Sequence, residues 1–372
     1  MDCMAKRTIG SAWARLLGRN IKTLTRQAVR AGSRSLTKAM KAPPVKRDRP
    51  AKPGKPAAGI KPTWPAARAA PARSAKPVPP AGAGSWTTGV VLGVTGSPTG
   101  GRRYALYRPP GVQRSEALPL VVMLHGCAQD AKSFAGCTRM NAVAARERFL
   151  VLYPEQDRLA NAQGCWNWFD TRSGRAAAEA ASILRAIDQV CRSQPVDGAQ
   201  VIVSGLSAGA SMAALLVTLH PARFKAVVMH SGVPPGTADS TLSALSAMRG
   251  RRATRALGST PAAMAAAWPP LLVIHGTADT VVDIRNGRAA AQAWAHAAGA
   301  VAGPPRTVQR GQRYPMVLTD FKRGRRTVAT LAEVAGLGHA WSGGAAGQRF
   351  SDAKGPDASR MVWAFAARQL KV

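Results

Sequence analysis

The sequence predicts an α/β protein whose mostly parallel sheet carries helices on both faces, preceded by a disordered basic N-terminal extension. From Ser85 onward, short continuous apolar segments alternate with Ala-rich segments of helical periodicity. Strands that are buried on both faces are apolar throughout, and such strands separated by helices are typical of parallel sheets. Residues 1–84 lack this alternation and are dominated by Pro, Ala, Lys and Arg, so we expect one folded domain over residues 85–372.

The N-terminal extension is strongly basic. Residues 1–84 contain 19 of the 52 Lys and Arg residues and two of the 18 acidic residues, so this part and residues 85–372 each carry a net charge of +17. The stretch 41–84 has no periodic apolar face and buries too little surface to offset the entropy of ordering. Residues 11–32 have apolar residues at helical spacing, which allows a short amphipathic helix. Such an arm would bind a polyanion or an anionic membrane surface, and the alternative is a solvated extension without a partner.

The expected elements of the folded part follow in order along the chain. Two segments rich in β-branched and aromatic residues predict an opening hairpin, 87–96 and 102–109. Uninterrupted apolar segments predict buried strands at 118–126, 149–154, 200–205, 226–232 and 271–276. Apolar residues at spacings of three and four predict helices at 140–148, 179–194, 210–220, 287–299 and 359–370. A glycine between two further strand-like segments predicts a second hairpin, 314–323 and 326–334.

A serine between two glycines separates a predicted strand from a predicted helix. The stretch GLSAG, residues 205–209, is either a tight turn that holds a serine or an elbow that exposes Ser207 as a nucleophile. A serine hydroxyl needs a base and an orienting carboxylate to attack. Asp279 follows one predicted strand and His339 follows the last one, so both belong at the carboxyl edge of the sheet, where ligands bind. Asp283 is a rival to Asp279 for the carboxylate.

The chain order Ser207, Asp279, His339 is that of the α/β-hydrolase fold, which we therefore predict. Acyl transfer on a serine also needs backbone N–H groups that point at the oxygen on which negative charge develops. Ala208 offers one such group at the start of a helix, and Cys127 offers a second from the loop that follows the strand at 118–126. The sequence therefore predicts an oxyanion hole formed by these two residues.

Four segments, LHGCAQD, LVLYPEQDRLANAQGCWNWFD, GLSAGASM and GHAWSGG, together resemble the polyhydroxybutyrate (PHB) depolymerase-type esterases, which include feruloyl and acetylxylan esterases. The resemblance covers residues 85–372. It implies a cofactor-free serine esterase that acts through an acyl-enzyme on short-chain acyl esters, hydroxyalkanoate oligomers, or feruloyl and acetyl esters. It makes Ser207 the nucleophile, Asp279 the carboxylate and His339 the base. Two of the segments contain Cys127 and Cys165, which are candidates for a disulfide.

The sequence departs from the family in two ways. The basic extension is no part of the family's catalytic pattern, and about thirty residues follow His339, without the appended substrate-binding domain of secreted polymer depolymerases. We therefore expect soluble esters to be better substrates than dense polymer film. A serine peptidase of the same fold is the alternative enzyme, with 237–268 as a cap over the site. The resemblance implies an extracellular protein, whereas the absence of a recognisable signal peptide indicates the cytoplasm.

Several further residues have two interpretations. Trp166, Trp168 and Trp341 either form aromatic walls of a substrate pocket or pin their own loops. His125 is expected to be structural. His230 and His275 either line the site or satisfy local backbone groups, and His220 and His296 are expected on helix surfaces. Cys137 and Cys191 either pair or are buried apolar residues, and Asp352 and Asp357 are expected in solvated loops. No cysteine or histidine spacing predicts a zinc site, and no apolar run approaches the ~20 residues of a membrane span.

Overall fold

The computed structural model describes residues 84–92, 100–254 and 267–370 of the chain. The basic extension, with the amphipathic helix expected at 11–32, lies outside the described residues. The same holds for residues 93–96 of the first strand expected at 87–96, and for part of the segment expected to form a cap, 237–268.

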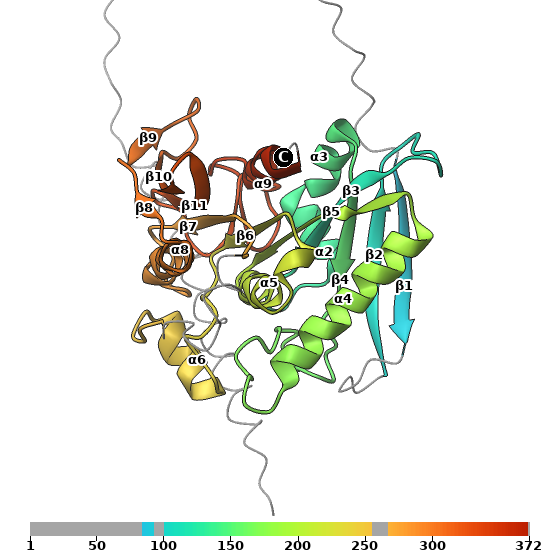
Figure 1. The fold of residues 1–372 in the computed structure, drawn as a ribbon, viewed down its shortest axis with the longest axis horizontal. Coiled ribbons are helices and arrows are strands. Elements are labelled where there is room, and N and C mark those ends of the chain that lie inside the picture. The colour runs from blue at the N-terminus through green and yellow to red at the C-terminus, as the bar shows by residue number, and fades with distance from the viewer. Residues whose placement is uncertain (1–83, 93–99, 255–266, 371–372) are drawn as a thin grey trace, which may run out of the picture. The chain divides into compact units, whose positions relative to one another are not determined.

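Within the described residues, eleven strands form one mixed sheet in the order β1-β2-β4-β3-β5-β6-β7-β11-β10-β8, with β9 paired to β10 (Figure 1). The six central strands, from β4 to β11, run parallel, and antiparallel strands flank them on both sides. The mostly parallel sheet is therefore confirmed. The strand bounds are β1 Ser85–Leu92, β2 Gly101–Arg108, β3 Leu118–Leu124, β4 Leu150–Pro154, β5 Val196–Leu206, β6 Ala226–His230, β7 Leu271–Gly276, β8 Val301–Ala302, β9 Arg306–Val308, β10 Met316–Arg323 and β11 Arg326–Val334.

Helices cover both faces of the sheet, as predicted (Figure 1). Side chains alternate between the two faces along a strand, so Leu120 and Val122 of β3 belong to one core cluster and Val121 and Met123 to another. The first cluster includes residues of α4, α5 and α8, and the second includes residues of α2, α3 and α9. The helix bounds are α2 Ala131–Thr138, α3 Met140–Glu147, α4 Arg175–Ser193, α5 Ala208–Leu219, α6 Thr241–Met248, α8 Arg285–Ala298 and α9 Ala358–Leu370, with a 3₁₀ turn at Pro221–Arg223.

In the described part of the chain, two helices were not predicted from the sequence, and both are short. Each of α2 and α6 has eight residues. Both helices begin at a capping box, in which Asp130 is paired with Ser133 and Ser240 with Ser243. These capping residues are the sequence feature from which the two helices could have been predicted. A further pair of two-residue strands, β12 Trp341–Ser342 and β13 Ser351–Asp352, forms a separate small sheet.

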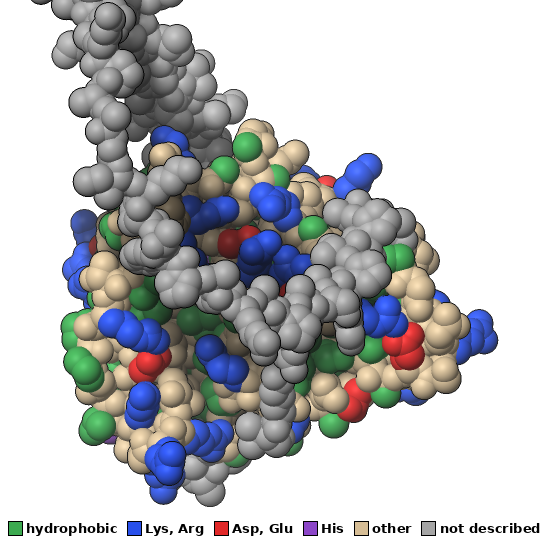
Figure 2. Space-filling model, turned by 90° about the horizontal axis from the view of Figure 1, so that it is seen from above, with side chains coloured by type: hydrophobic (Ala, Val, Ile, Leu, Met, Phe, Trp, Pro, Cys, Tyr) green, Lys and Arg blue, Asp and Glu red, His purple; other side chains and the backbone are tan. Residues whose placement is uncertain are grey.

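The surface of the folded part is basic. Figure 2 shows Lys and Arg side chains distributed over the described part of one face, where they outnumber Asp and Glu. Most ion pairs among the described residues lie at the surface, as between Arg148 and Glu116 or Arg306 and Asp320. Exposed pairs contribute about 0–1 kcal/mol each, so they have little influence on the fold. No helix of the described part is both long and apolar enough to cross a membrane.

Candidate active site

Ser207 lies on a strained turn between β5 and α5. Its backbone has φ 57° and ψ −120°, a conformation that residues other than glycine rarely adopt. The Ser207 N–H donates to the carbonyl oxygen of His230 at 2.9 Å, which ties the turn to β6. A Cβ atom on Gly205 would lie 2.4 Å from the carbonyl carbon of Gly209, and one on Gly209 would lie 2.1 Å from the carbonyl oxygen of Leu124. Glycine is therefore required on both sides of the serine because α5 packs directly on the ends of β3 and β5.

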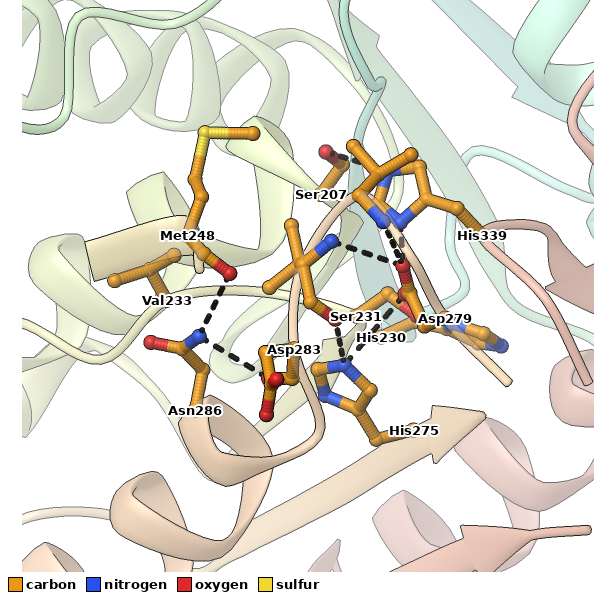
Figure 3. A network of polar contacts seen from close by, with 12 residues as sticks. Ser207, His230, Ser231, Val233, Met248, His275, Asp279, Asp283, Asn286 and His339 are labelled. Atoms are coloured by element: carbon orange, nitrogen blue, oxygen red, sulfur yellow. Dashed lines mark hydrogen bonds and ion pairs between the residues drawn. The ribbon is translucent and has the colours of Figure 1, made fainter. Parts of the chain in front are cut away.

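The structure brings Ser207, His339 and Asp279 together (Figure 3). His339 Nε2 is 2.9 Å from Ser207 Oγ, and His339 Nδ1 is 2.8 Å from Asp279 Oδ2. The three residues follow β5, β11 and β7, so the sheet holds groups that are far apart in the sequence. The rival carboxylate, Asp283, instead pairs with Arg285 at the start of α8.

The Asp279 carboxylate is fixed in its orientation. Its Oδ1 atom accepts hydrogen bonds from the N–H groups of Val281 and Val282 at 3.0 and 2.9 Å. Burial alone would raise the pKa of this carboxyl, but the hydrogen bond from His339, the nearby His339 and His275 rings and the hydrogen bond from the Val282 N–H together lower the pKa below its ordinary value. Asp279 is therefore ionised at neutral pH and accepts the Nδ1–H of His339, which leaves the Nε2 lone pair directed at Ser207 Oγ.

Two backbone N–H groups beside Ser207 have no hydrogen-bond partner in the part of the chain that the structure describes. Among the described residues, neither Cys127 nor Ala208 donates its N–H to another group. Ala208 is the first residue of α5, so its N–H has no acceptor within the helix. The loop that contains Cys127 is held on both sides of it, because Gln129 Oε1 accepts from the Gly126 N–H at 3.0 Å and Gln163 O accepts from the Ala128 N–H at 2.8 Å.

A disulfide joins Cys127 to Cys165, so the loop beside Ser207 is covalently linked to the loop with the sequence CWNWFD. The other two cysteines considered for pairing, Cys137 and Cys191, are free. Cys137 is buried and its thiol donates to the carbonyl oxygen of Phe350.

Two of the three tryptophans considered as pocket walls are buried in the core. Trp166 and Trp341 are 0% exposed, so they are core residues and not walls of an open pocket. The Trp166 indole N–H donates to the carbonyl oxygen of His125 at 3.0 Å, and Trp341 stacks on the ring of His230 with its N–H bonded to Ser359. A buried indole with a satisfied N–H stabilises the core through its large apolar area. Trp168 retains 8% exposure and packs edge-on against Phe169.

A buried polar network behind the CWNWFD loop was missed by the sequence analysis. Glu179 Oε1 accepts from the side-chain amides of Gln156 at 2.7 Å and Asn167 at 2.6 Å, while its Oε2 accepts from the Asn167 backbone N–H. Gln156 in turn accepts from Arg102, whose guanidinium stacks over Trp166. The available signal was an acidic residue four positions before Ile183, on the apolar face of the helix predicted at 179–194.

Three of the remaining histidines are buried and make backbone contacts around the site. His125 Nε2 accepts from the Gln156 N–H, His230 Nε2 accepts from the Ser342 N–H, and His275 Nε2 donates to the carbonyl oxygen of Val282. Each is 1% exposed or less, so none lines an open surface. Away from the site, His220 caps α5 and His296 is exposed on α8. Asp352 accepts from the Lys354 N–H of its loop, and Asp357 accepts from the Arg360 N–H in the first turn of α9. The described residues contain no cluster of three His, Cys, Asp or Glu side chains that could hold a metal ion.

Comparison with known proteins identifies a family and several relatives of this chain. The family model described as "Esterase PHB depolymerase" matches residues 102–304. Poly(3-hydroxyalkanoate) depolymerase C of Paucimonas lemoignei is 31% identical over 184 residues, which are 45% of this chain and 42% of that protein, so the chain spans less than half of its length. Feruloyl esterase B of Neurospora crassa is 26% identical over 65% of this chain and 84% of its own length. The solved acetyl xylan esterase from Aspergillus awamori shares the fold, with a TM-score of 0.54 and 20% identity over 68% of this chain and 94% of that one.

Proposed function

The chain belongs to the esterase PHB depolymerase family, and from this premise we propose that it hydrolyses carboxylic esters through a Ser207–His339–Asp279 triad and an acyl-enzyme intermediate. The observation that carries the proposal is the hydrogen-bonded series from Ser207 Oγ to His339 Nε2 and from His339 Nδ1 to Asp279 Oδ2. The strained serine turn supports it further, because strain of this kind is found where a group must be exposed for chemistry.

In the proposed first step, Ser207 Oγ attacks the ester carbonyl carbon while its proton passes to His339 Nε2. Asp279 stabilises the imidazolium that forms, and its two backbone hydrogen bonds hold it in place for this purpose. The proton then passes to the leaving alkoxide, and the alcohol departs. Water, activated by His339, releases the acid from Ser207 in the second half of the reaction.

We assign the oxyanion hole to the backbone N–H groups of Cys127 and Ala208. Their lack of protein partners in the described part of the chain supports the assignment, since an oxyanion hole needs donors that are not already engaged. The N-terminal dipole of α5 adds favourable potential at the same point. Removing one such donor typically costs about 10²–10³-fold in kcat.

The proposed substrates are short-chain acyl esters, hydroxyalkanoate oligomers, and feruloyl or acetyl esters. The feruloyl esterase relative supports the feruloyl class in particular, because the match covers 84% of its length. A panel of p-nitrophenyl esters from acetate to palmitate, methyl ferulate, acetylated xylan, hydroxybutyrate oligomers and polymer film would rank the classes. Polymer film cleared faster than every soluble ester is hydrolysed would contradict the proposal.

Ser207→Ala tests the chemistry itself. The variant is expected to lose hydrolysis of p-nitrophenyl acetate and labelling by a fluorophosphonate, while it keeps its melting temperature. Ser193→Ala is the matched control because Ser193 is an exposed serine at the end of α4. Substantial turnover by Ser207→Ala would refute the assignment, and peptide cleavage without ester cleavage by the wild type would favour the peptidase alternative.

The disulfide between Cys127 and Cys165 supports an oxidising, extracytoplasmic compartment as the working environment. A reductant is then expected to lower esterase activity, because the bond links the proposed oxyanion loop to the CWNWFD loop. Mass spectrometry that finds both thiols free after non-reducing purification would refute this part of the proposal.

We propose for residues 1–84 an accessory role in contacting a polyanion or an anionic membrane surface, on the basis of their 19 Lys and Arg residues. Binding of this segment to DNA or anionic vesicles should weaken as salt rises, and deletion of the segment should leave ester turnover nearly unchanged. Binding that is insensitive to salt would contradict an electrostatic role.

A further inference from the structure

Two buried histidines lie directly beneath the residues of the proposed triad (Figure 3). His230 is the last residue of β6, and His275 is the penultimate residue of β7. Both side chains are 0% exposed, so neither can reach a substrate. The chemistry described above uses neither ring. What each ring contacts is the backbone of a loop that contains a proposed catalytic residue.

His275 holds the loop that contains Asp279. Its Nε2–H donates to the carbonyl oxygen of Val282 at 2.8 Å, and the Val282 N–H donates to Asp279 Oδ1 at 2.9 Å. The same His275 nitrogen lies 3.6 Å from Asp279 Oδ2. Its other ring nitrogen, Nδ1, has no hydrogen-bond partner in the described chain and packs against Gly287, where an added Cβ would lie 2.7 Å away. The ring is therefore neutral with its proton on Nε2.

His230 contacts two of the catalytic segments at once. Its carbonyl oxygen accepts the Ser207 N–H at 2.9 Å, and its Nε2 accepts the Ser342 N–H at 3.1 Å, three residues after His339. The ring stacks on Trp341 at a centroid distance of 5.0 Å, and its Nδ1 is 3.2 Å from Ser231 Oγ. An Nε2 that accepts must be unprotonated, so this ring carries its proton on Nδ1.

We propose that His230 and His275 are positioning residues, whose neutral imidazoles set the His339 and Asp279 loops at the distances that proton transfer from Ser207 requires. The proposal rests on the triad assigned above. Effective general-base catalysis needs the reacting atoms within hydrogen-bond reach, and a displacement of about 1 Å costs about 10²-fold in rate. The two rings meet this need from the ends of β6 and β7, which are hydrogen-bonded to neighbouring strands of the sheet.

Neutrality is part of the proposed role. Burial lowers the pKa of His230 to about 3 and also lowers the pKa of His275. The titratable groups that act on these rings are His339, Asp279 and Asp283, together with the rings themselves. A protonated His275 would also pair with Asp279, so Asp279 would stabilise the His339 imidazolium less and His339 would be a weaker base. Because burial keeps both rings neutral, that charge remains available to His339.

Paired substitutions at each position test the proposal in the full-length protein. Glutamine places its amide near the position of Nε2, so His275→Gln can still donate to Val282 and His230→Gln can still accept from Ser342. His275→Leu and His230→Leu remove the hydrogen bond and keep an apolar side chain. His296→Leu, on the exposed side of α8, is the control for loss of a histidine elsewhere.

The measurements are kcat and KM for p-nitrophenyl acetate, with reactive serines counted by fluorophosphonate titration, and the pH dependence of kcat/KM. We expect the leucine variants to lose about 10²-fold in kcat per titrated site while KM stays within twofold, and the glutamine variants to recover at least tenfold. The acid limb of kcat/KM should move to lower pH in the leucine variants, because a misaligned Asp279 stabilises the His339 imidazolium less.

Wild-type kcat per titrated site in both leucine variants would overturn the inference, as would a loss that only follows the number of titrated sites. If a leucine variant does not fold, His275→Asn and His230→Asn replace it in the test, because the shorter asparagine amide does not reach the position of Nε2. These variants should lose activity while the glutamine variants keep it, and equal activity would overturn the inference. A wild type without any ester turnover would overturn the proposed function together with this inference.

Discussion

Replacement of Gly209 by alanine tests whether the serine turn depends on the close packing of α5 against β3. An added Cβ would lie 2.1 Å from the carbonyl oxygen of Leu124 and 2.5 Å from that of His125. Both contacts are with backbone atoms, so no side chain can rotate away to relieve them. Either α5 or the end of β3 must move by about 1 Å to restore ordinary van der Waals separation.

The expected magnitudes follow from two opposing effects. Overpacking costs about 1–3 kcal/mol, whereas alanine in a helix gains about 0.5–1 kcal/mol over glycine. We therefore expect Gly209→Ala to lower the free energy of unfolding by about 1–2 kcal/mol. The same movement separates the Ala208 N–H from the Cys127 loop, and a displacement of that size should lower kcat by about 10²-fold. Urea unfolding and p-nitrophenyl acetate kinetics measure the two effects separately.

Gly136→Ala is the matched control in the same protein. Gly136 lies in α2 and is exposed, and an added Cβ there would meet no atom within 4 Å. This variant should gain about 0.5–1 kcal/mol in stability and keep the wild-type kcat. If Gly209→Ala matches the wild type in both stability and kcat, the explanation of the two flanking glycines by close packing is wrong.

Three further changes have defined outcomes. Asp279→Asn should lower kcat by about 10³–10⁴-fold and Asp283→Asn by less than twofold, as ester kinetics would reveal; the opposite ranking would make Asp283 the carboxylate. Burial lowers the pKa of His125 to about 4, so the unfolded chain binds this proton first. As pH drops from about 6.5 to 4, His125 should lower stability by about 1.4 kcal/mol per unit, in addition to the contributions of the buried His230 and His275. His125→Gln should reduce the slope in urea titrations by that amount, and an unchanged slope would exclude His125. Glu179→Gln replaces an acceptor of three hydrogen bonds by an amide that carries donors of its own, so the free energy of unfolding should fall by about 2 kcal/mol. An unfolding free energy within about 0.5 kcal/mol of the wild type would contradict the described network.

The three proposed catalytic residues were identified from the sequence because each follows a buried strand. A parallel sheet brings the carboxyl ends of its strands to one edge, so, apart from the rival carboxylate Asp283, order along the chain and position after a strand selected Ser207, Asp279 and His339. The structure places these side chains at 2.8 and 2.9 Å from one another. The choice between Asp279 and Asp283 is also explained locally, since Arg285 directs Asp283 away toward α8.

The role of the tryptophans could not be read from the sequence, because burial depends on residues that are distant along the chain. Trp341 is close to His339 in sequence, which suggested a pocket wall. In the fold it is covered by Phe134, His230 and Ser359, which come from α2, β6 and α9. A pattern of residue types shows that an aromatic side chain is present, but which elements pack over it is decided by the tertiary fold.

The buried polar groups around the site have a common physical cause. Loops that leave the edge of a sheet have few backbone hydrogen bonds of their own, yet the proposed catalysis requires them to hold positions within a fraction of an ångström. In this protein buried side chains form hydrogen bonds with the backbone of these loops: His230 and His275 at strand ends, and Glu179 on α4. Each of these groups would destabilise the core if it were unpaired, because a buried polar atom without a partner costs about 1–3 kcal/mol. That cost disappears only when the loop sits in its functional position, so the same interactions that satisfy the core also select the geometry of the site.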